Sequence, residues 1–98
     1  MNKIDVLERL RQFEPALRVR GVRHAALFGS VARGDERATS DIDILIEIDP
    51  AANMTAFDYA GLKSYISGLF DRPVDVVNRD SLKAHIHTSA AADAIDAF

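Results

Sequence analysis

Cysteine is absent from the sequence, which excludes disulfide bonds and thiolate-bound zinc sites. This absence fits a cytoplasmic protein, although many secreted proteins share it. The first residues, MNKIDVLERLRQFEP, argue more directly, because Asp5, Glu8 and Glu14 interrupt their apolar positions. The segment therefore has neither the apolar core of a signal peptide nor the acid-poor composition of a transit peptide. We expect a cytoplasmic location.

Long apolar runs and a strong net charge are also missing. No uninterrupted apolar stretch is long enough to span a membrane, and three prolines with five glycines leave no room for a low-complexity segment. The formal net charge is −3 with both signs interspersed, so the sequence offers no broad cationic surface to duplex DNA. The composition, 98 residues with 48% hydrophobic and 28% charged, suits one soluble globular domain spanning residues 1–98.

Three stretches have apolar residues at helical spacing. The first runs from Ile4 to Leu17, and Pro15 is expected to kink or restart it. The second covers about residues 55–70, where Thr55-Ala56-Phe57-Asp58 has the spacing of a capping box. The third closes the chain after a turn at residues 78–80. Its apolar set is Leu82, Ile86, Ala90, Ile95 and Phe98.

Three other stretches predict strands. Residues 22–28 (VRHAALF) are short and mostly apolar, residues 41–48 (DIDILIEI) carry isoleucine at every second position, and residues 73–77 (PVDVV) are β-branched. The helix between the last two strands favours a parallel pair with a right-handed crossover. The short connection after the first strand brings the second back antiparallel to it. The predicted class is α/β (α+β), with a small mixed three-stranded sheet flanked by about four helices.

The acidic residues of these strands are predicted to meet at one edge of the sheet. Asp41 and Asp43 alternate with the isoleucines, so they project from the face opposite the core. If Val74 and Val76 are buried with the isoleucines, Asp75 lies on the same face, with opposed Cβ atoms about 5 Å apart. Without a cation the three carboxylates would repel one another. Hard oxygen ligands suit Mg²⁺ or Mn²⁺, and Mg²⁺ usually binds carboxylates together with the phosphates of a substrate.

Gly29 and Ser30, at the end of the first strand, offer a place for such a phosphate. A glycine lets the phosphate approach the backbone, and Ser30 can cap a short helix and donate its hydroxyl. The N-terminus of that helix presents free N–H groups to an anion. Arg33, one turn further on, could reach the same phosphates, although a surface arginine is the ordinary interpretation of its position.

The stretch GSVARGDERATSDIDILIEID resembles the GS-x10-DxD signature of the DNA polymerase β-like nucleotidyltransferases. Its GSxARG opening resembles their minimal subgroup, the MNT proteins, and the order of the other segments is similar over nearly the whole chain. The resemblance implies metal-dependent transfer of AMP from ATP to a hydroxyl group, with pyrophosphate leaving. It implies that Asp41 and Asp43 hold the metals, that Asp75 completes the site and helps to activate the acceptor, and that Gly29 with Ser30 seats the triphosphate.

The resemblance also implies a partner. MNT proteins commonly pair with a HEPN-domain toxin and act as its antitoxin, some of them by adenylylating a tyrosine. We therefore expect a HEPN toxin as partner and ATP as substrate, within a homo- or hetero-oligomer. Two alternatives stay open: a non-catalytic antitoxin that neutralises its partner by binding, and a nucleotidyltransferase that acts on RNA or a small hydroxyl compound.

Several residues also have a plain structural interpretation. Alternating acids on a strand usually form its solvated face, and only the Gly-Ser pair at fixed spacing favours metal binding instead. For Asp75 taken alone, the interpretations as a metal ligand and as an exposed strand acid are about equally supported. His85 and His87 lie two apart on a predicted helix and so point in different directions, which favours surface histidines over a metal pair. Tyr59 and Tyr65 are interpreted as packing residues.

Overall fold

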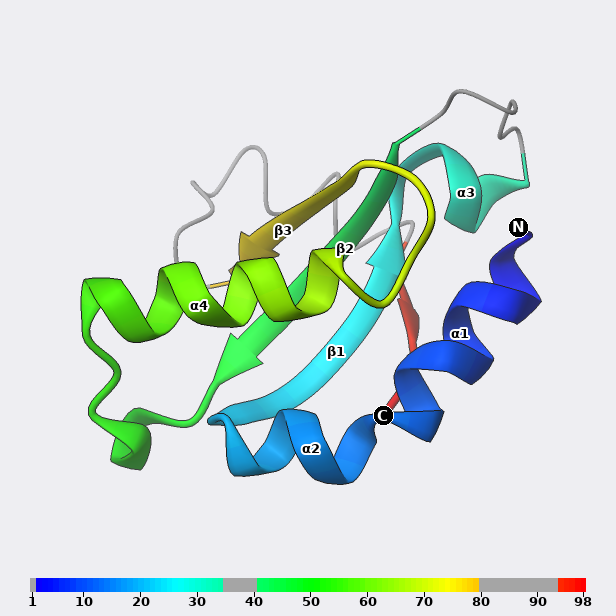
Figure 1. The fold of residues 1–98 in the computed structure, drawn as a ribbon. Coiled ribbons are helices and arrows are strands. Elements are labelled where there is room, and N and C mark those ends of the chain that lie inside the picture. Colours follow the sequence, from blue (N-terminus) through cyan, green and yellow to red (C-terminus); the bar gives the residue numbers. More distant parts are fainter. Residues whose placement is uncertain (1, 35–40, 80–93) are drawn as a thin grey trace.

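The computed structural model describes residues 2–34, 41–79 and 94–98 (Figure 1). None of the helices in these ranges has the length and apolar character needed to cross a membrane. Helices and strands follow the predicted order from the first helical segment to the strand at residues 74–78. In order, they are α1 (Lys3–Gln12), α2 (Glu14–Val19), β1 (Val22–Phe28), α3 (Gly29–Arg33), β2 (Ile42–Ile48), the 3₁₀ helix η1 (Pro50–Ala52), α4 (Ala56–Ser67), β3 (Val74–Asn78) and β4 (Ile95–Asp96).

The strands form one mixed sheet in the order β3-β2-β1-β4. β1 runs antiparallel to β2 and β4, whereas β2 and β3 are parallel, which confirms both predicted pairings. The sheet has four strands rather than the three predicted. Ile95, expected in a closing helix, lies in β4 and pairs with Leu27. Strand formation satisfies backbone groups along the free edge of β1, and the Ala97 N–H donates to the Ala25 carbonyl at 2.8 Å. Phe98, also expected in that helix, follows β4 in non-helical structure, and its N–H donates to the Ala25 carbonyl at 3.3 Å. The remaining apolar positions assigned to the helix, Leu82, Ile86 and Ala90, lie outside the described residues.

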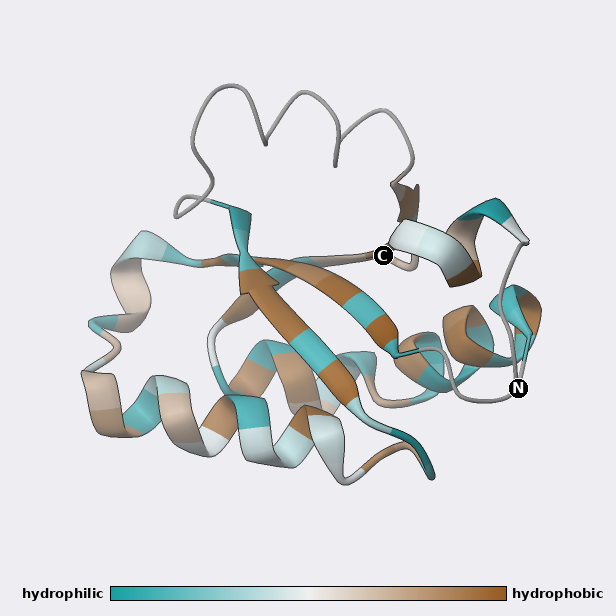
Figure 2. Ribbon diagram, turned by 90° about the horizontal axis from the view of Figure 1, so that it is seen from above, coloured by the Kyte–Doolittle hydropathy of each residue, from teal (hydrophilic) through white to brown (hydrophobic). Residues whose placement is uncertain are grey.

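The core lies between the sheet and the helices α1, α2 and α4. Figures 1 and 2 show these three helices on one face of the sheet. Ile42, Ile44 and Ile46 of β2 are fully buried there, as their alternation predicted. The opposite face is not purely solvated, because Leu45, expected on the acidic side, is only 2% exposed. The alternation therefore predicted the buried isoleucines correctly, but its prediction that Leu45 lies on a solvated face was wrong.

Local sequence signals set the helix boundaries. Asn2 caps α1 by accepting a hydrogen bond from the Asp5 N–H. Pro15 lies in the first turn of α2, so it restarts the helix as expected. The predicted capping box of α4 is confirmed, because the Thr55 hydroxyl accepts from the Asp58 N–H at 3.1 Å and the Asp58 carboxylate accepts from the Thr55 N–H at 3.1 Å.

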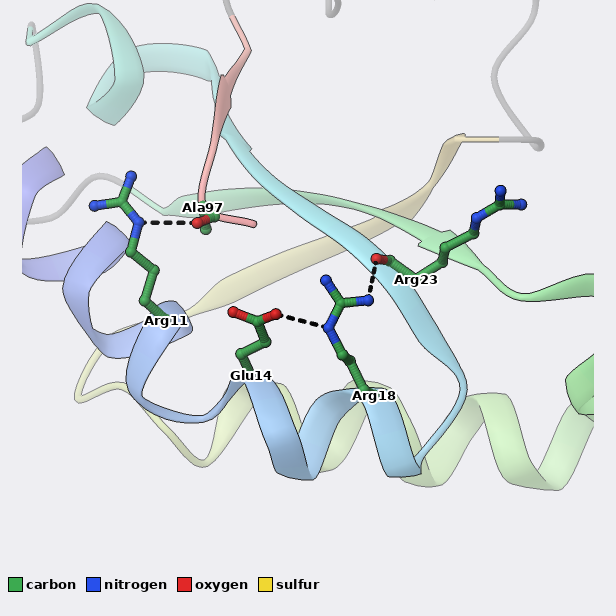
Figure 3. Close-up of polar contacts among 5 residues, drawn as sticks. All are labelled: Arg11, Glu14, Arg18, Arg23 and Ala97. Carbon is green, nitrogen blue, oxygen red and sulfur yellow. Dashed lines mark hydrogen bonds and ion pairs between the residues drawn. The ribbon is translucent and has the colours of Figure 1, made fainter.

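Arginine side chains join the helix layer to the sheet (Figure 3). Arg11 donates from Nε to the Ala97 carbonyl at 2.8 Å and so ties α1 to the C-terminal residues. Arg18 of α2 donates to the Arg23 carbonyl on β1 at 3.0 Å, while its Nε pairs with Glu14 Oε2 at 2.7 Å. These bonds tie α1 to the C-terminal residues and α2 to β1, the strand that ends at the acidic edge.

Candidate active site

Three strand ends meet at one edge of the sheet, where β1 stops and β2 and β3 begin. The register places Phe28 opposite Asp43 and Asp43 beside Asp75. The Ile42 N–H donates to the Pro73 carbonyl at 2.9 Å, which fixes the start of β2 against the residue preceding β3. Because paired residues on neighbouring strands project from the same face, the two carboxylates lie next to each other. The predicted meeting of Asp43 with Asp75 is therefore present.

Gly29, the residue after β1, lies against the Asp43 side chain. Its φ is +77°, in the left-handed region that glycine adopts without steric cost. A Cβ atom added at residue 29 would overlap Asp43 Oδ2 and lie 3.0 Å from its Cγ. Both the backbone conformation and the contact thus require glycine. The predicted neighbourhood of the Gly-Ser turn and the acidic strand is a direct contact in the structure.

The electrostatics of Asp43 reflect this crowding. Its pKa is raised above the ordinary carboxyl value, first by burial and then by the negative charges of Asp75 and Asp41. The positive charge of Arg33 acts in the opposite direction. Three other predicted site residues, Asp41, Asp75 and Arg33, are thus close enough to influence the Asp43 carboxylate. Such a group is stabilised in its charged form by a cation.

Ser30 and Arg33 both belong to α3, the short helix that follows β1. The helix begins at Gly29, its N-cap is Phe28, and no side chain makes a capping hydrogen bond. The prediction that Ser30 caps this helix is therefore wrong, because the chain turns into the helix one residue earlier. Ser30 is half-buried beside the acidic edge, and Arg33 is exposed at the last position of α3.

The donor set fits a hard divalent cation, although the side chains are not closed around one. Within the described ranges, no group of three acidic or histidine side chains stands close enough to hold a metal ion as arranged. Asp41 and Asp75 are exposed, whereas Asp43 is held against Gly29. Without a positive charge, repulsion keeps the exposed carboxylates of Asp41 and Asp75 away from that of Asp43. A bound cation would allow all three to converge on it. The three carboxylates are the hard oxygen donors that Mg²⁺ and Mn²⁺ prefer, and a bound cation would offset the negative charge that crowds Asp43.

Tyr59 of α4 is electrostatically linked to this edge, which the sequence did not indicate. Its ring packs against the core, in agreement with the packing role expected. The pKa of its hydroxyl is raised by burial, lowered by a hydrogen bond with the backbone of Asn78, and raised by the charge of Asp75. No spacing rule relates residue 59 to residue 75, because the crossover between α4 and β3 creates the proximity. His85 and His87 lie outside the described residues.

The acidic edge lies apart from three hollows that the described part of the chain forms. Two hollows of about 530 Å³ and one of about 240 Å³ lie elsewhere, and Asp41, Asp43 and Asp75 line none of these three. The chemistry therefore concentrates at exposed strand ends, where phosphates and an acceptor group can reach the carboxylates from solvent.

A mixed sheet with helices on one face and carboxylates at adjoining strand starts, beside a glycine turn, defines the class of nucleotidyltransferases. Comparison with known proteins leads to the same class. Residues 3–97 match the family described as "Nucleotidyltransferase domain". The chain belongs to this family, and its resemblance to the minimal MNT branch is confirmed by the relatives it matches.

Those relatives are similar over nearly their whole length. The putative protein adenylyltransferase MJ0435 of Methanocaldococcus jannaschii is 31% identical over 93 residues, which cover 95% of this chain and 98% of that protein. The solved structure of a putative minimal nucleotidyltransferase is 32% identical, with a TM-score of 0.73 over 97% of this chain and 95% of its own. This likeness extends to sequence as well as fold.

A more distant likeness involves a complex. One chain in the structure of a tri-AMPylated Shewanella oneidensis HEPN toxin with an MNT antitoxin has a TM-score of 0.64 at 18% identity, covering 94% of this chain and 71% of that one. At this level of identity the likeness shows the fold alone.

Proposed function

We propose that this protein is a Mg²⁺-dependent adenylyltransferase that transfers AMP from ATP to a tyrosine hydroxyl of a partner HEPN toxin, and that it acts as the antitoxin of that pair. The observation that carries the proposal is the contact between Gly29 and Asp43, with Asp75 in register beside it. A glycine cradle and paired carboxylates are the two parts that phosphoryl transfer needs in one place.

In this proposal each site residue has a separate task. Asp41 and Asp43 hold the divalent cation, Mg²⁺ or Mn²⁺, and Asp75 completes its ligands. Gly29 keeps side-chain atoms away from the triphosphate, Ser30 donates its hydroxyl to a phosphate oxygen, and the Arg33 guanidinium contributes positive charge. When bound, the cation would neutralise charge on the triphosphate and on the leaving pyrophosphate.

The transfer itself replaces a phosphoanhydride bond of ATP by a phosphoester bond to the acceptor. The tyrosine oxygen attacks the α-phosphorus of ATP, the bond from that phosphorus to the bridging oxygen of the β-phosphate breaks, and pyrophosphate leaves with the bond electrons. The phenolic proton must be accepted as the new bond forms. In this proposal Asp75, exposed near the start of β3, accepts it directly or through one water. The product is a tyrosine with a phosphodiester-linked AMP.

The names of the relatives support the proposed partner and the proposed transfer to a protein. MJ0435 carries the name of a protein adenylyltransferase, and the Shewanella complex pairs an MNT antitoxin with a HEPN toxin that is AMPylated. The exposed carboxylates of Asp41 and Asp75 suit an acceptor delivered by another protein, since that protein can provide further walls of the site. ATP and such a partner would meet in the cytoplasm.

The test is transfer of label from α-³²P-ATP to a purified HEPN toxin in the presence of Mg²⁺. We expect label on the toxin with the wild-type chain, and none with the Asp41→Asn, Asp43→Asn double variant. Glu47→Gln is the matched control, because Glu47 is a carboxylate on the same strand and face, about 13 Å further along β2. Glu47→Gln should label at the wild-type rate.

Two results would contradict the proposal. Labelling that survives the double substitution would show that these carboxylates are not the catalytic ones. If the double variant transfers no label but still binds and neutralises the toxin, binding alone silences the partner. Label on RNA or on a small hydroxyl compound in place of the toxin would change the acceptor and leave the transferase chemistry standing.

A further inference from the structure

The side of α4 that faces away from the sheet differs from an ordinary solvated helix surface. Leu62 and Ile66 face the core, so the helical period places Phe57, Gly61 and Ser64 on the opposite side. We call this set, together with Ala60, the outer face of α4. It carries no charged residue, whereas surface helices usually present charged groups to water. Solvation alone does not explain such a surface.

Exposed apolar side chains gather beside the outer face. The described residues have three large apolar side chains that are exposed, Ile4, Val19 and Phe57. Phe57 is 90% exposed and Val19 is 88% exposed, and both line the same hollow of about 530 Å³ between the end of α2 and the first half of α4. Two of the three therefore lie at one place, which is characteristic of a surface that another protein covers.

Gly61, at the centre of the outer face, is not required by packing against any of the described residues. A Cβ atom added there would meet nothing within 4 Å. A glycine within a helix costs about 1 kcal/mol relative to alanine, and here no internal contact offsets that cost. Glycine at an exposed helix position allows a second backbone to approach closely.

Charged groups next to the outer face are arranged symmetrically about Gly61. Asp58 comes three residues before Gly61, and the Arg20 guanidinium lies 4.0 Å from the centroid of the ring of Tyr65, four residues after it. Along the helix axis, Asp58 and Tyr65 are offset from Gly61 by about 4.5 Å and about 6 Å in opposite directions. Asp58 and Arg20 line the same hollow, so both charges lie on the same side of α4.

We propose that the outer face of α4 joins two copies of this chain, packed antiparallel about a two-fold axis at Gly61. A two-fold axis brings each residue opposite a residue at the same distance on the other side of the axis. The negative charge of Asp58 in one copy therefore faces the positive charge of Arg20 in the second. Phe57 of each copy covers Ser64 and Tyr65 of the other, and the two Gly61 backbones come closest at the axis.

The charges select this occupant. Parallel packing would place Asp58 against Asp58. A partner lacking a positive group at the matching offset would leave the Asp58 carboxylate with its capping hydrogen bond from the Thr55 N–H but without an opposite charge. An antiparallel second copy brings its own Arg20 opposite Asp58, so the chain itself provides both charges. The contact is built on a helix of 12 residues, about 18 Å long, so we expect a small and reversible interface. The inference does not depend on the proposed transferase chemistry.

The first test uses the absence of cysteine. In Gly61→Cys the introduced thiol is the only one in the chain, and at a two-fold axis it lies beside its own copy within disulfide range. Mild oxidation should therefore produce a covalent dimer. Lys63→Cys is the matched control, since it is exposed on the same helix but roughly 160° around the axis from residue 61. Under the same conditions Lys63→Cys should stay largely monomeric.

The second test uses charge at the axis. Gly61→Glu and Gly61→Lys should each be monomeric by sedimentation equilibrium at protein concentrations where the wild type dimerises, because the axis brings like charges together. An equimolar mixture of the two variants should dimerise again. Both substitutions replace glycine by a better helix former in open space, so thermal unfolding should show a fold at least as stable as the wild type.

The proposal is overturned if the wild type remains monomeric at several hundred micromolar, or if residues 61 and 63 cross-link equally. It is also overturned if the mixture of charged variants gains no affinity over either alone. Should the chain stay monomeric while Gly61→Glu lowers the affinity for a HEPN toxin, the outer face of α4 would belong to a different protein and not to a second copy.

Discussion

Gly29 and Asp43 touch so closely that the glycine hydrogen takes the place where any other residue would have a carbon atom. An added Cβ would overlap Asp43 Oδ2, and the positive φ of residue 29 independently disfavours a side chain. The contact joins the end of β1 to the start of β2, where Phe28 pairs with Asp43. It makes the turn and the carboxylate one structural unit.

Gly29→Ala should therefore destabilise the protein more than an ordinary glycine substitution at positive φ. Gly34→Ala is the matched control, since Gly34 has φ +81° and no atom within 4 Å of an added Cβ. The control should lose roughly 1–2 kcal/mol from the conformation alone. Gly29→Ala should lose about 1–3 kcal/mol more from the overlap. Urea unfolding of both variants measures the difference, and equal losses would mean that Asp43 moves aside without cost.

Asp43→Asn should stabilise the protein at neutral pH when divalent cations are removed with EDTA. The folded state raises the pKa of Asp43 above its ordinary value of 3.8, so the folded state binds the proton more tightly than the unfolded state. The free energy of unfolding contributed by this group therefore falls as pH rises from below 3.8 through the folded pKa. Asparagine carries no charge, so the variant does not lose this part of the free energy of unfolding as pH rises.

The measurement is thermal unfolding of wild type and Asp43→Asn from pH 3 to pH 8. The advantage of the variant should be largest at neutral pH and should shrink below pH 3.8. Added Mg²⁺ should raise the melting temperature of the wild type and leave the variant unchanged. An Asp43→Asn protein that is less stable than the wild type at pH 7 would contradict the repulsion inferred here.

Much of this site could be predicted because its signals are local. Alternation of isoleucine with acid gave the second strand, and the structure has it at Ile42–Ile48. A helix between two strands gave their parallel pairing, which sets Asp43 beside Asp75. The capping box at Thr55 gave the start of α4 within one residue. Each of these features depends on residues close together in the chain.

The features that the sequence did not reveal depend on residues far apart in it. β4 is two residues long, too short for a period, and forms because β1 has a free edge 70 residues earlier in the chain. Ile95 suited a helical pattern equally well. Leu45 is buried on a face expected to be solvated, and Tyr59 is influenced by Asp75, because tertiary packing brings these groups together. Periodicity contains no information about such contacts.

Arg33→Met should weaken ATP binding without altering the chemical step, if the proposed function holds. Methionine keeps much of the aliphatic length and removes the positive charge that acts on Asp43 and on the phosphates. We expect KM for ATP to rise about tenfold, which corresponds to about 1.4 kcal/mol, with little change in kcat. Arg23→Met, an exposed arginine on β1, is the control and should leave both constants unchanged. A fall in kcat with constant KM would instead assign Arg33 to the transition state.

Thr55→Ala should lower stability through the start of α4 while leaving the acidic edge intact. The substitution removes the hydroxyl that accepts from the Asp58 N–H, and this type of change costs about 1 kcal/mol. For a domain of this size the melting temperature should fall by about 4–8 °C. Ser64→Ala, in the exposed middle of the same helix, should have no such effect because Ser64 caps nothing. Thr55→Ser should retain most of the stability, since serine keeps the accepting oxygen. If Thr55→Ser fell as far as Thr55→Ala, the lost stability would come from the methyl group, and the capping hydrogen bond would not be what begins α4 at this position.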